Sequence, residues 1–153
     1  NCALSGEVPT ELGQLTKLTE LHLHENDLLG SLPTELGSLT ALLQLYMDNN
    51  RLHGGIPTTL GKLVNLEHLF LYGNQLGLKS NNGISDIPTE FGQLTKLIQL
   101  RMNANRIHGT IPTEIGKLTL MEKLALDYNR LSGTVPEELG LMKSLKEMTL
   151  YEN

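Results

Sequence analysis

Apolar residues recur along the chain at fixed intervals and divide it into similar units. Each unit opens with a segment of the form LxxLxLxxNxL, such as LTELHLHENDL at 18–28, in which apolar and polar residues alternate. Alternation with a period of two is typical of a β-strand that buries one face and exposes the other. A segment of the form GxIPxxLGxL follows, such as GGIPTTLGKL at 54–63. The pattern therefore predicts one short strand and one return segment in every unit.

The prolines show the length of the unit. All six follow Val, Leu or Ile in the second segment, and successive prolines are 24, 24, 31, 24 and 24 residues apart. The longer interval reflects extra residues within GLKSNNGISD at 77–86, which are predicted to loop out beyond a strand and are a further candidate for ligand contact. Repeats this regular predict a single domain over 1–153, because each unit must bury its apolar face against its neighbours. The units are a partial repeat at 1–17, full repeats at 18–41, 42–65, 66–96, 97–120 and 121–144, and a partial repeat at 145–153.

These motifs resemble the leucine-rich-repeat family, and the second half of each unit resembles its plant-type subclass of 24-residue repeats, which occurs in receptor ectodomains and also in protists. NRLHGGIPTTLGKL at 50–63 and NRIHGTIPTEIGKL at 105–118 carry the likeness, whose pattern extends over essentially the whole chain. The resemblance implies an α/β solenoid, a right-handed superhelix with a concave parallel β-sheet and short helical or 3-10 turns on its convex side. Strands about 4.8 Å apart would make the sheet roughly 25 Å wide, enough for a peptide or an oligosaccharide.

A polar column is predicted to hold the turn that follows each strand. The turning backbone leaves N–H and C=O groups unpaired, and a buried side-chain amide can satisfy them. This asparagine column consists of Cys2, Asn26, Asn50, Asn74, Asn105, Asn129 and Asn153. The family pattern admits Cys at this position, so Cys2 is predicted to be structural rather than reactive.

Glycines and threonines of the second segment are also assigned to the fold. One set of glycines is expected to permit a turn before the proline: Gly30, Gly54, Gly109 and Gly133. Another set is expected to follow the return segment: Gly13, Gly37, Gly61, Gly92, Gly116 and Gly140. The threonines after the prolines are expected to cap the short helical turns: Thr10, Thr34, Thr58, Thr89 and Thr113.

Composition and charge narrow the classes of partner. Hydrophobic residues make up 39% of the chain, which favours a folded core over disorder. The formal net charge of −5, with no basic run, argues against nucleic acid as a partner. No stretch approaches the roughly 20 apolar residues that a membrane-spanning helix needs, and the absence of a leader before Asn1 predicts a mature product or a fragment. A single cysteine leaves the redox compartment open.

The outward positions of the strands are free of stacking constraints, so a binding site is sought there. All four tyrosines and Phe70 fall on outward positions, whereas Phe91 falls on an inward one. Exposed aromatic side chains are enriched at recognition surfaces, although strands also favour aromatics for other reasons. The predicted central contacts are Tyr46, Phe70, Tyr72, Arg101 and Tyr128. The predicted polar surround is His22, His24, Asp48, His68 and Asn103.

This surface predicts a non-catalytic recognition module that binds a peptide, a protein or a glycan. No serine occupies an outward strand position, and Asp48 and Asp127 lie three strands apart, roughly 14 Å, which is too far for a glycosidase pair. His22 and His24 share a strand face near Asp48, but side-by-side rings do not give the closed geometry of a structural zinc site. We therefore expect no enzyme activity, no metal and no cofactor, while a pH response of these histidines stays open.

The family resemblance implies a cellular location, and it also shows where this chain departs from a known ligand-binding motif. Peptide-binding plant receptors of this family that hold a ligand carboxylate with an Arg-x-Arg pair would have that motif on a concave strand, whereas this chain has Arg101-Met102-Asn103. The resemblance implies an extracellular or cell-surface protein, although the chain has no Asn-x-Ser/Thr glycosylation site. Apolar layers at the ends predict contact with further repeats or with another subunit.

The alternative hypothesis is a structural or adhesive array, or an ice-binding surface that uses the threonine column on the convex side. Regular threonine rows on solenoids resemble ice-binding faces. Four glutamates beside that column count against the alternative: Glu11, Glu35, Glu90 and Glu114.

Overall fold

The chain forms a solenoid in which one parallel sheet lines one side. The computed structural model describes residues 3–78 and 86–153. Consecutive strands pair in register, so that Leu21, Leu45 and Leu69 lie beside one another on the inward face. The strands of this sheet, each contributed by a different repeat, are β2 (Glu20–His22), β4 (Gln44–Tyr46), β6 (His68–Phe70), β8 (Gln99–Arg101), β10 (Lys123–Ala125) and β12 (Glu147–Thr149).

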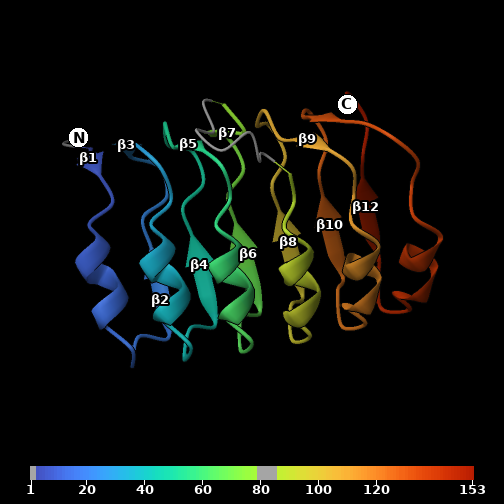
Figure 1. Ribbon diagram of the computed structural model, residues 1–153, viewed down its shortest axis with the longest axis horizontal. Helices are drawn as coiled ribbons and strands as arrows, with labels where there is room; N and C mark the ends of the chain where they lie inside the picture. Colours follow the sequence, from blue (N-terminus) through green and yellow to red (C-terminus); the bar gives the residue numbers. More distant parts are fainter. Residues whose placement is uncertain (1–2, 79–85) are drawn as a thin grey trace.

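Short 3-10 helices form the opposite side of the solenoid and run in a row in front of the sheet (Figure 1). A proline is the N-cap of every one, with φ between −67° and −61°, which suits the angle that its ring imposes. The expectation that threonines cap these turns is therefore wrong, because threonine is the first residue inside five of the helices and no side chain caps their N–H groups. The helices are η1 (Thr10–Gln14), η2 (Thr34–Ser38), η3 (Thr58–Lys62), η4 (Thr89–Gln93), η5 (Thr113–Lys117) and η6 (Glu137–Leu141).

Glycine inside each 3-10 helix allows neighbouring repeats to stack closely. The sequence placed these glycines after the return segment, whereas Gly37 is the fourth residue of η2. A Cβ at Gly37 would lie 2.4 Å from the carbonyl oxygen of Thr59 in the next helix, so only glycine fits. Gly140 in η6 differs, since a Cβ there would meet nothing within 4 Å.

A second set of short parallel strands was not predicted from the sequence. These strands lie just beyond the asparagine column, where the pattern reads x-Leu-x-Gly or x-Ile-x-Gly in several units. Gly54 and Gly109 end two of them with φ of 80° and 82°, in the left-handed region that favours glycine. The pairs are β1 (Ser5–Glu7) with β3 (Asp27–Leu29), β5 (His53–Gly54) with β7 (Gln75–Leu76), and β9 (His108–Gly109) with β11 (Arg130–Leu131).

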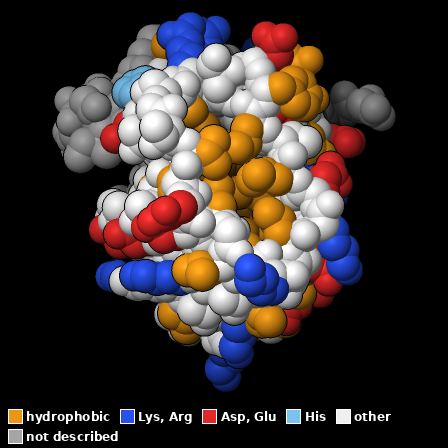
Figure 2. Space-filling model, turned by 90° about the vertical axis from the view of Figure 1, so that its right-hand side faces the viewer, with side chains coloured by type: hydrophobic (Ala, Val, Ile, Leu, Met, Phe, Trp, Pro, Cys, Tyr) orange, Lys and Arg blue, Asp and Glu red, His pale blue; other side chains and the backbone are white. Residues whose placement is uncertain are grey.

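The core is a stack of inward leucines between the sheet and the 3-10 helices. Leu45, Leu69 and Leu124 from the strands are fully buried, as is Phe91 from η4. At the C-terminal end the stack is uncovered, and Figure 2 shows hydrophobic side chains gathered at the centre of that face. Among the residues near this end, Val135, Leu141 and Met148 are 45–58% exposed.

Candidate recognition surface

The asparagine column determines where the strand ends lie. The amide oxygen of Asn74 accepts a hydrogen bond from the backbone N–H of Leu52, 3.0 Å away, and its amide nitrogen donates to the carbonyls of Met47 and Leu71 at 3.0 and 3.1 Å. Asn105 repeats this arrangement and donates to Leu71 as well. The same bonding recurs at Asn26, Asn50, Asn129 and Asn153, whereas Cys2 lies outside the described residues.

Three aromatic rings and one guanidinium stack into a continuous row across four strands. His22 and Tyr46 have ring centroids 4.4 Å apart with 7° between their planes, and Tyr46 and Phe70 have the same separation with 8°. The guanidinium carbon of Arg101 lies 4.7 Å from the centre of the Phe70 ring, within the range of a cation–π contact. We call His22, Tyr46, Phe70 and Arg101 the aromatic ladder.

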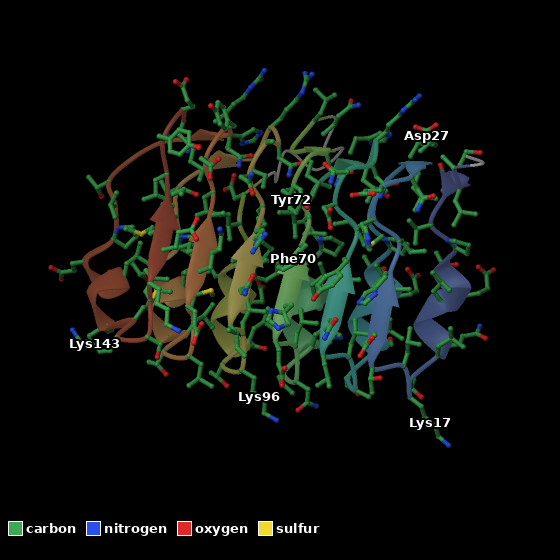
Figure 3. All side chains as sticks on the ribbon, turned by 180° about the vertical axis from the view of Figure 1, so that it is seen from behind. Lys17, Asp27, Phe70, Tyr72, Lys96 and Lys143 are labelled. Carbon is green, nitrogen blue, oxygen red and sulfur yellow. The ribbon has the colours of Figure 1, made fainter. Side chains whose placement is uncertain are left out.

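Register produces the aromatic ladder. His22 pairs with Tyr46, Tyr46 with Phe70, and Phe70 with Arg101, each on the next strand of the sheet. The spacing of paired strands, about 4.8 Å, is close to the separation of stacked rings, so planar side chains in one register position stack. Figure 3 views this face and shows Phe70 near its middle, with Tyr72 beyond it.

Two hydrogen bonds hold the ends of the aromatic ladder. The Nε2 atom of His22 lies 3.1 Å from the amide oxygen of Gln44, and Arg101 donates from Nη2 to the amide oxygen of Gln99 at 2.9 Å. The Nε–H of Arg101 is buried without a hydrogen-bond partner among the described residues. This N–H of Arg101 is therefore a donor that no described group of the protein accepts.

The row beside the aromatic ladder contains a buried carboxylate. Asp48 is only 3% exposed and accepts a hydrogen bond from the side chain of Asn49 at 3.0 Å. Burial raises the pKa of the Tyr72 phenol above its usual value, and the hydrogen bond and negative charge of Asp48 raise it further. Asp48, expected in the ligand-contacting surround, is thus a largely buried neighbour of Tyr72, and its contact with a ligand stays a prediction.

Replacement of Asp48 by Asn is expected to lower the pKa of Tyr72 toward the ordinary tyrosine value of about 10, because the negative charge that disfavours the phenolate is removed. A raised pKa contributes stability that is present below the ordinary value and is lost as pH rises through the pKa of the folded state. NMR titration of each tyrosine ring would measure the change. Burial raises the pKa of the Tyr46 phenol, and the negative charge of Glu20 raises it further. As a control, Glu20→Gln should therefore lower the pKa of Tyr46 and leave the pKa of Tyr72 unchanged. An unchanged Tyr72 titration in Asp48→Asn would contradict this account.

Tyr128 does not join the other predicted central contacts. It follows β10, has a φ of 52° and is 53% exposed. Its ring packs edge-on against Tyr151, with centroids 5.2 Å apart. The reason is local, since the residue before each column asparagine turns into the left-handed region, as Asn49 and Ala104 also do.

The predicted polar surround is distributed around the aromatic ladder. The rings of His24 and His68 lie 6.1 Å from Tyr46 and Phe70 respectively, and the Nδ1 atom of each is buried without a partner among the described residues. Asn103 lines the same hollow as Tyr72 and Arg101. In the described part of the chain, no group of three or more His, Cys, Asp or Glu residues is arranged to hold a metal ion.

A hollow of about 350 Å³ lies beside Arg101, where the aromatic ladder stops. Its centre is Ala125, which occupies the register position next to Arg101 and is 4% exposed. Lys123 bonds to Glu147 at 2.6 Å on one side, and Asp127 accepts from the Thr149 hydroxyl on the other. A hollow at these residues was not predicted from the sequence, although Ala125 is a small residue at a repeat position that is planar in His22, Tyr46, Phe70 and Arg101. The predicted loop contact at 77–86 lies mostly outside the described residues.

Comparison with known proteins agrees with this geometry. The family model described as Leucine Rich Repeat matches residues 17–39 and 41–63. The chain is a leucine-rich-repeat protein of the plant type, as its motifs and its strand and 3-10 pattern indicate. Comparison with curated proteins finds no similar sequence.

Solved structures of plant proteins are similar over nearly the whole chain. The ectodomain of the membrane receptor kinase GASSHO1/SCHENGEN3 from Arabidopsis thaliana, in complex with CASPARIAN STRIP INTEGRITY FACTOR 2, is 36% identical with a TM-score of 0.90. It matches 97% of this chain, which spans only 17% of that chain. The plant peptide hormone receptor RGFR1 in complex with RGF2 is 34% identical, with a TM-score of 0.88 over 97% of this chain and 23% of its own.

A plant ice-binding protein is also similar. It is 29% identical with a TM-score of 0.79, over 90% of this chain and 42% of that chain. The matched structures therefore include more than one activity on the same repeat architecture, so the outward residues must decide between them. In the described residues, no helix has the length and apolar character to cross a membrane.

Proposed function

We propose that this chain is a non-catalytic recognition module that binds an extended peptide, or an extended segment of a protein, on its concave face. The aromatic ladder is the observation that carries the proposal, because it places rigid side chains in a row across four strands. Rigid aromatic and arginine side chains form binding hot spots at low cost in conformational entropy. The similar receptor structures contain peptide hormones, which supports the same use of this surface.

The orientation of the rings favours a peptide over a glycan. Each face of Tyr46 is covered, by His22 on one side and by Phe70 on the other, and Phe70 lies between Tyr46 and Arg101. The surface therefore presents ring edges, which carry partial positive charge, rather than faces. Carbonyl oxygens of an extended backbone suit such edges, whereas a sugar ring that stacks on an aromatic face finds no free face on Tyr46 or Phe70.

The location and the lack of catalysis follow from the same proposal. The similar structures are receptor ectodomains, which supports an extracellular or cell-surface location. The buried carboxylates Asp48 and Asp127 serve as hydrogen-bond acceptors for neighbouring side chains, which argues against a hydrolytic role.

Selection from a random peptide display library is expected to yield peptides that bind the native chain and lose at least tenfold in affinity, about 1.4 kcal/mol, in a Tyr46→Ala, Phe70→Ala, Tyr72→Ala variant. A matched control, Thr34→Ala with Thr113→Ala, changes exposed residues of the convex side and should keep the affinity. Circular dichroism would establish that both variants fold.

Two results would overturn the proposal. If every selected peptide tolerates the triple substitution, the peptides bind elsewhere. If a glycan array yields ligands that require Tyr46 and Phe70 while no peptide does, the ligand of this face is a glycan rather than a peptide.

Ice binding by the threonine row is a second candidate, favoured by the likeness to the plant ice-binding protein. The hydroxyl of Thr34 donates to Glu35 at 3.1 Å, and Thr113 donates to Glu114 at 3.3 Å, so these hydroxyls are engaged beside charged groups. Charged neighbours keep a surface hydrated by mobile water, which disfavours a flat match to ice. Thermal hysteresis of the native chain, abolished by Thr34→Ala with Thr113→Ala, would establish this candidate instead.

The apolar C-terminal end is proposed as a contact surface for a further repeat or another subunit. Exposed Leu141 and Met148 support this, as does Gly140, which leaves the space that a neighbouring 3-10 helix fills at the other glycines.

A further inference from the structure

The aromatic ladder ends at a position where the next side chain is missing. Large planar side chains occupy one register position on β2, β4, β6 and β8, and the following strand has Ala125 there. A guanidinium has two faces, and one face of Arg101 covers Phe70. Because β8 lies between β6 and β10 in the sheet, the other face is turned toward the space above Ala125.

That space is the hollow of about 350 Å³, within the range of roughly 300–1,000 Å³ that small-molecule sites have. Ala125 forms its floor, Arg101 and Thr149 close it along the row, and Tyr151 and Asp127 border it on one side. The floor is apolar and buried, while the surrounding side chains are polar.

We propose that the hollow above Ala125 receives a tyrosine side chain of the bound peptide, which stacks on the free face of Arg101 and completes the aromatic ladder as its fifth member. The inference rests on the proposed peptide recognition and names the residue type that anchors the ligand. An aromatic ring over Arg101 gains a cation–π contact in a partly desolvated position, as Phe70 does on the other face.

The polar border selects tyrosine over other planar or apolar groups. The carboxylate of Asp127 is 5% exposed and accepts a hydrogen bond from Thr149, and its charge and a hydrogen bond with the phenol raise the pKa of Tyr151. An ionised carboxylate has about four acceptor positions, so Asp127 retains capacity for a phenol O–H. Leucine offers no donor for this border, and phenylalanine offers a ring without one.

The charges around the hollow argue against an anionic ligand. Arg101 and Lys123 are balanced by Asp127 and Glu147, and Lys123 is already paired with Glu147 at 2.6 Å. A neutral ring with a hydroxyl suits this balance, whereas a carboxylate ligand would lie near two carboxylates.

Titration with N-acetyl-tyrosinamide, followed by NMR of the Ala125 methyl group, tests the inference with a probe of known identity. We expect millimolar binding and an upfield ring-current shift of the Ala125 methyl signal, with at least fivefold weaker binding of N-acetyl-leucinamide and of acetate. Ala125→Phe places a ring of the protein in the hollow and should reduce tyrosinamide binding at least tenfold. The matched control Glu20→Phe adds the same ring on the exposed outer face of β2, remote from the hollow, and should leave binding unchanged.

Arg101→Lys keeps the charge but removes the planar group, and it does not depend on the folding of Ala125→Phe. Stacking predicts at least a fivefold loss of tyrosinamide binding in this variant. Equal binding of tyrosinamide and leucinamide, stronger binding of acetate, or full binding by both Ala125→Phe and Arg101→Lys would each overturn the inference.

The displayed peptides separate this inference from the proposed function. If the selected peptides require Tyr46 and Phe70 yet bind the Ala125→Phe variant with the same affinity as the native chain, that result would contradict the tyrosine site and leave peptide recognition intact. A tyrosinamide shift at Ala125, when selection yields no binding peptide, would instead contradict the proposed function and leave the hollow as a tyrosine-binding site.

Discussion

Gly37→Ala is expected to lower the free energy of unfolding by about 3 kcal/mol, at the upper end of the usual cost of overpacking. The new methyl group would lie 2.4 Å from the carbonyl oxygen of Thr59 and 2.7 Å from its Cβ. The two helices η2 and η3 must separate to accommodate it, which also loosens the leucine layers between them. Urea unfolding followed by circular dichroism would measure the loss.

Gly140→Ala is the matched control for that substitution. The residue has the same place in η6, yet a Cβ there meets nothing within 4 Å. Alanine restricts the unfolded chain more than glycine does, so we expect no loss and a gain of up to about 1 kcal/mol. Equal destabilisation by the two substitutions would show that close stacking is not the reason for these glycines.

Asn74→Ala is expected to destabilise the fold by about 3 kcal/mol, because it leaves the backbone N–H of Leu52 buried without an acceptor and opens a small cavity. The carbonyls of Met47 and Leu71 retain partners, since Asn50 donates to the first and Asn105 to the second. The loss of stability should therefore arise mainly from the unpaired backbone N–H of Leu52. Amide hydrogen exchange at Leu52 should accelerate together with the drop in the urea midpoint.

Asn153→Ala provides the comparison at an exposed member of the same column. Its amide oxygen accepts from the N–H of Leu131 at 3.1 Å, but water can replace it there. We expect a loss of about 1 kcal/mol or less. If Asn74→Ala lowered the free energy of unfolding no more than Asn153→Ala does, the asparagine column would not stabilise the strand ends.

The repeat architecture was predictable because the same weak local pattern occurs in every unit. A three-residue strand is too short to be recognised alone, but the same alternation in successive units identifies β4, β6 and β10 together. The small parallel pairs such as β5 with β7 were missed, because two residues carry no periodic signal and their pairing depends on the neighbouring repeat.

The candidate site was predictable only as rows of outward residues. Tyr46 and Phe70 were assigned to one face from the period of two, and the structure stacks them. Tyr128 was grouped with them, but its left-handed backbone takes it out of the row. Asp48 was expected at the surface, whereas the neighbouring repeats bury it.

The repeat length, the inward leucines, the asparagine column and the residues available for recognition could be read from the sequence, because each depends on spacing within one unit. Which of those residues touch depends on how neighbouring units pair in the folded chain. Register between repeats brings His22, Tyr46, Phe70 and Arg101 into one stack and leaves a hollow at Ala125. Contacts between residues 24 to 31 positions apart form only when the backbones of successive units lie about 4.8 Å from each other, and that distance is a property of the folded sheet.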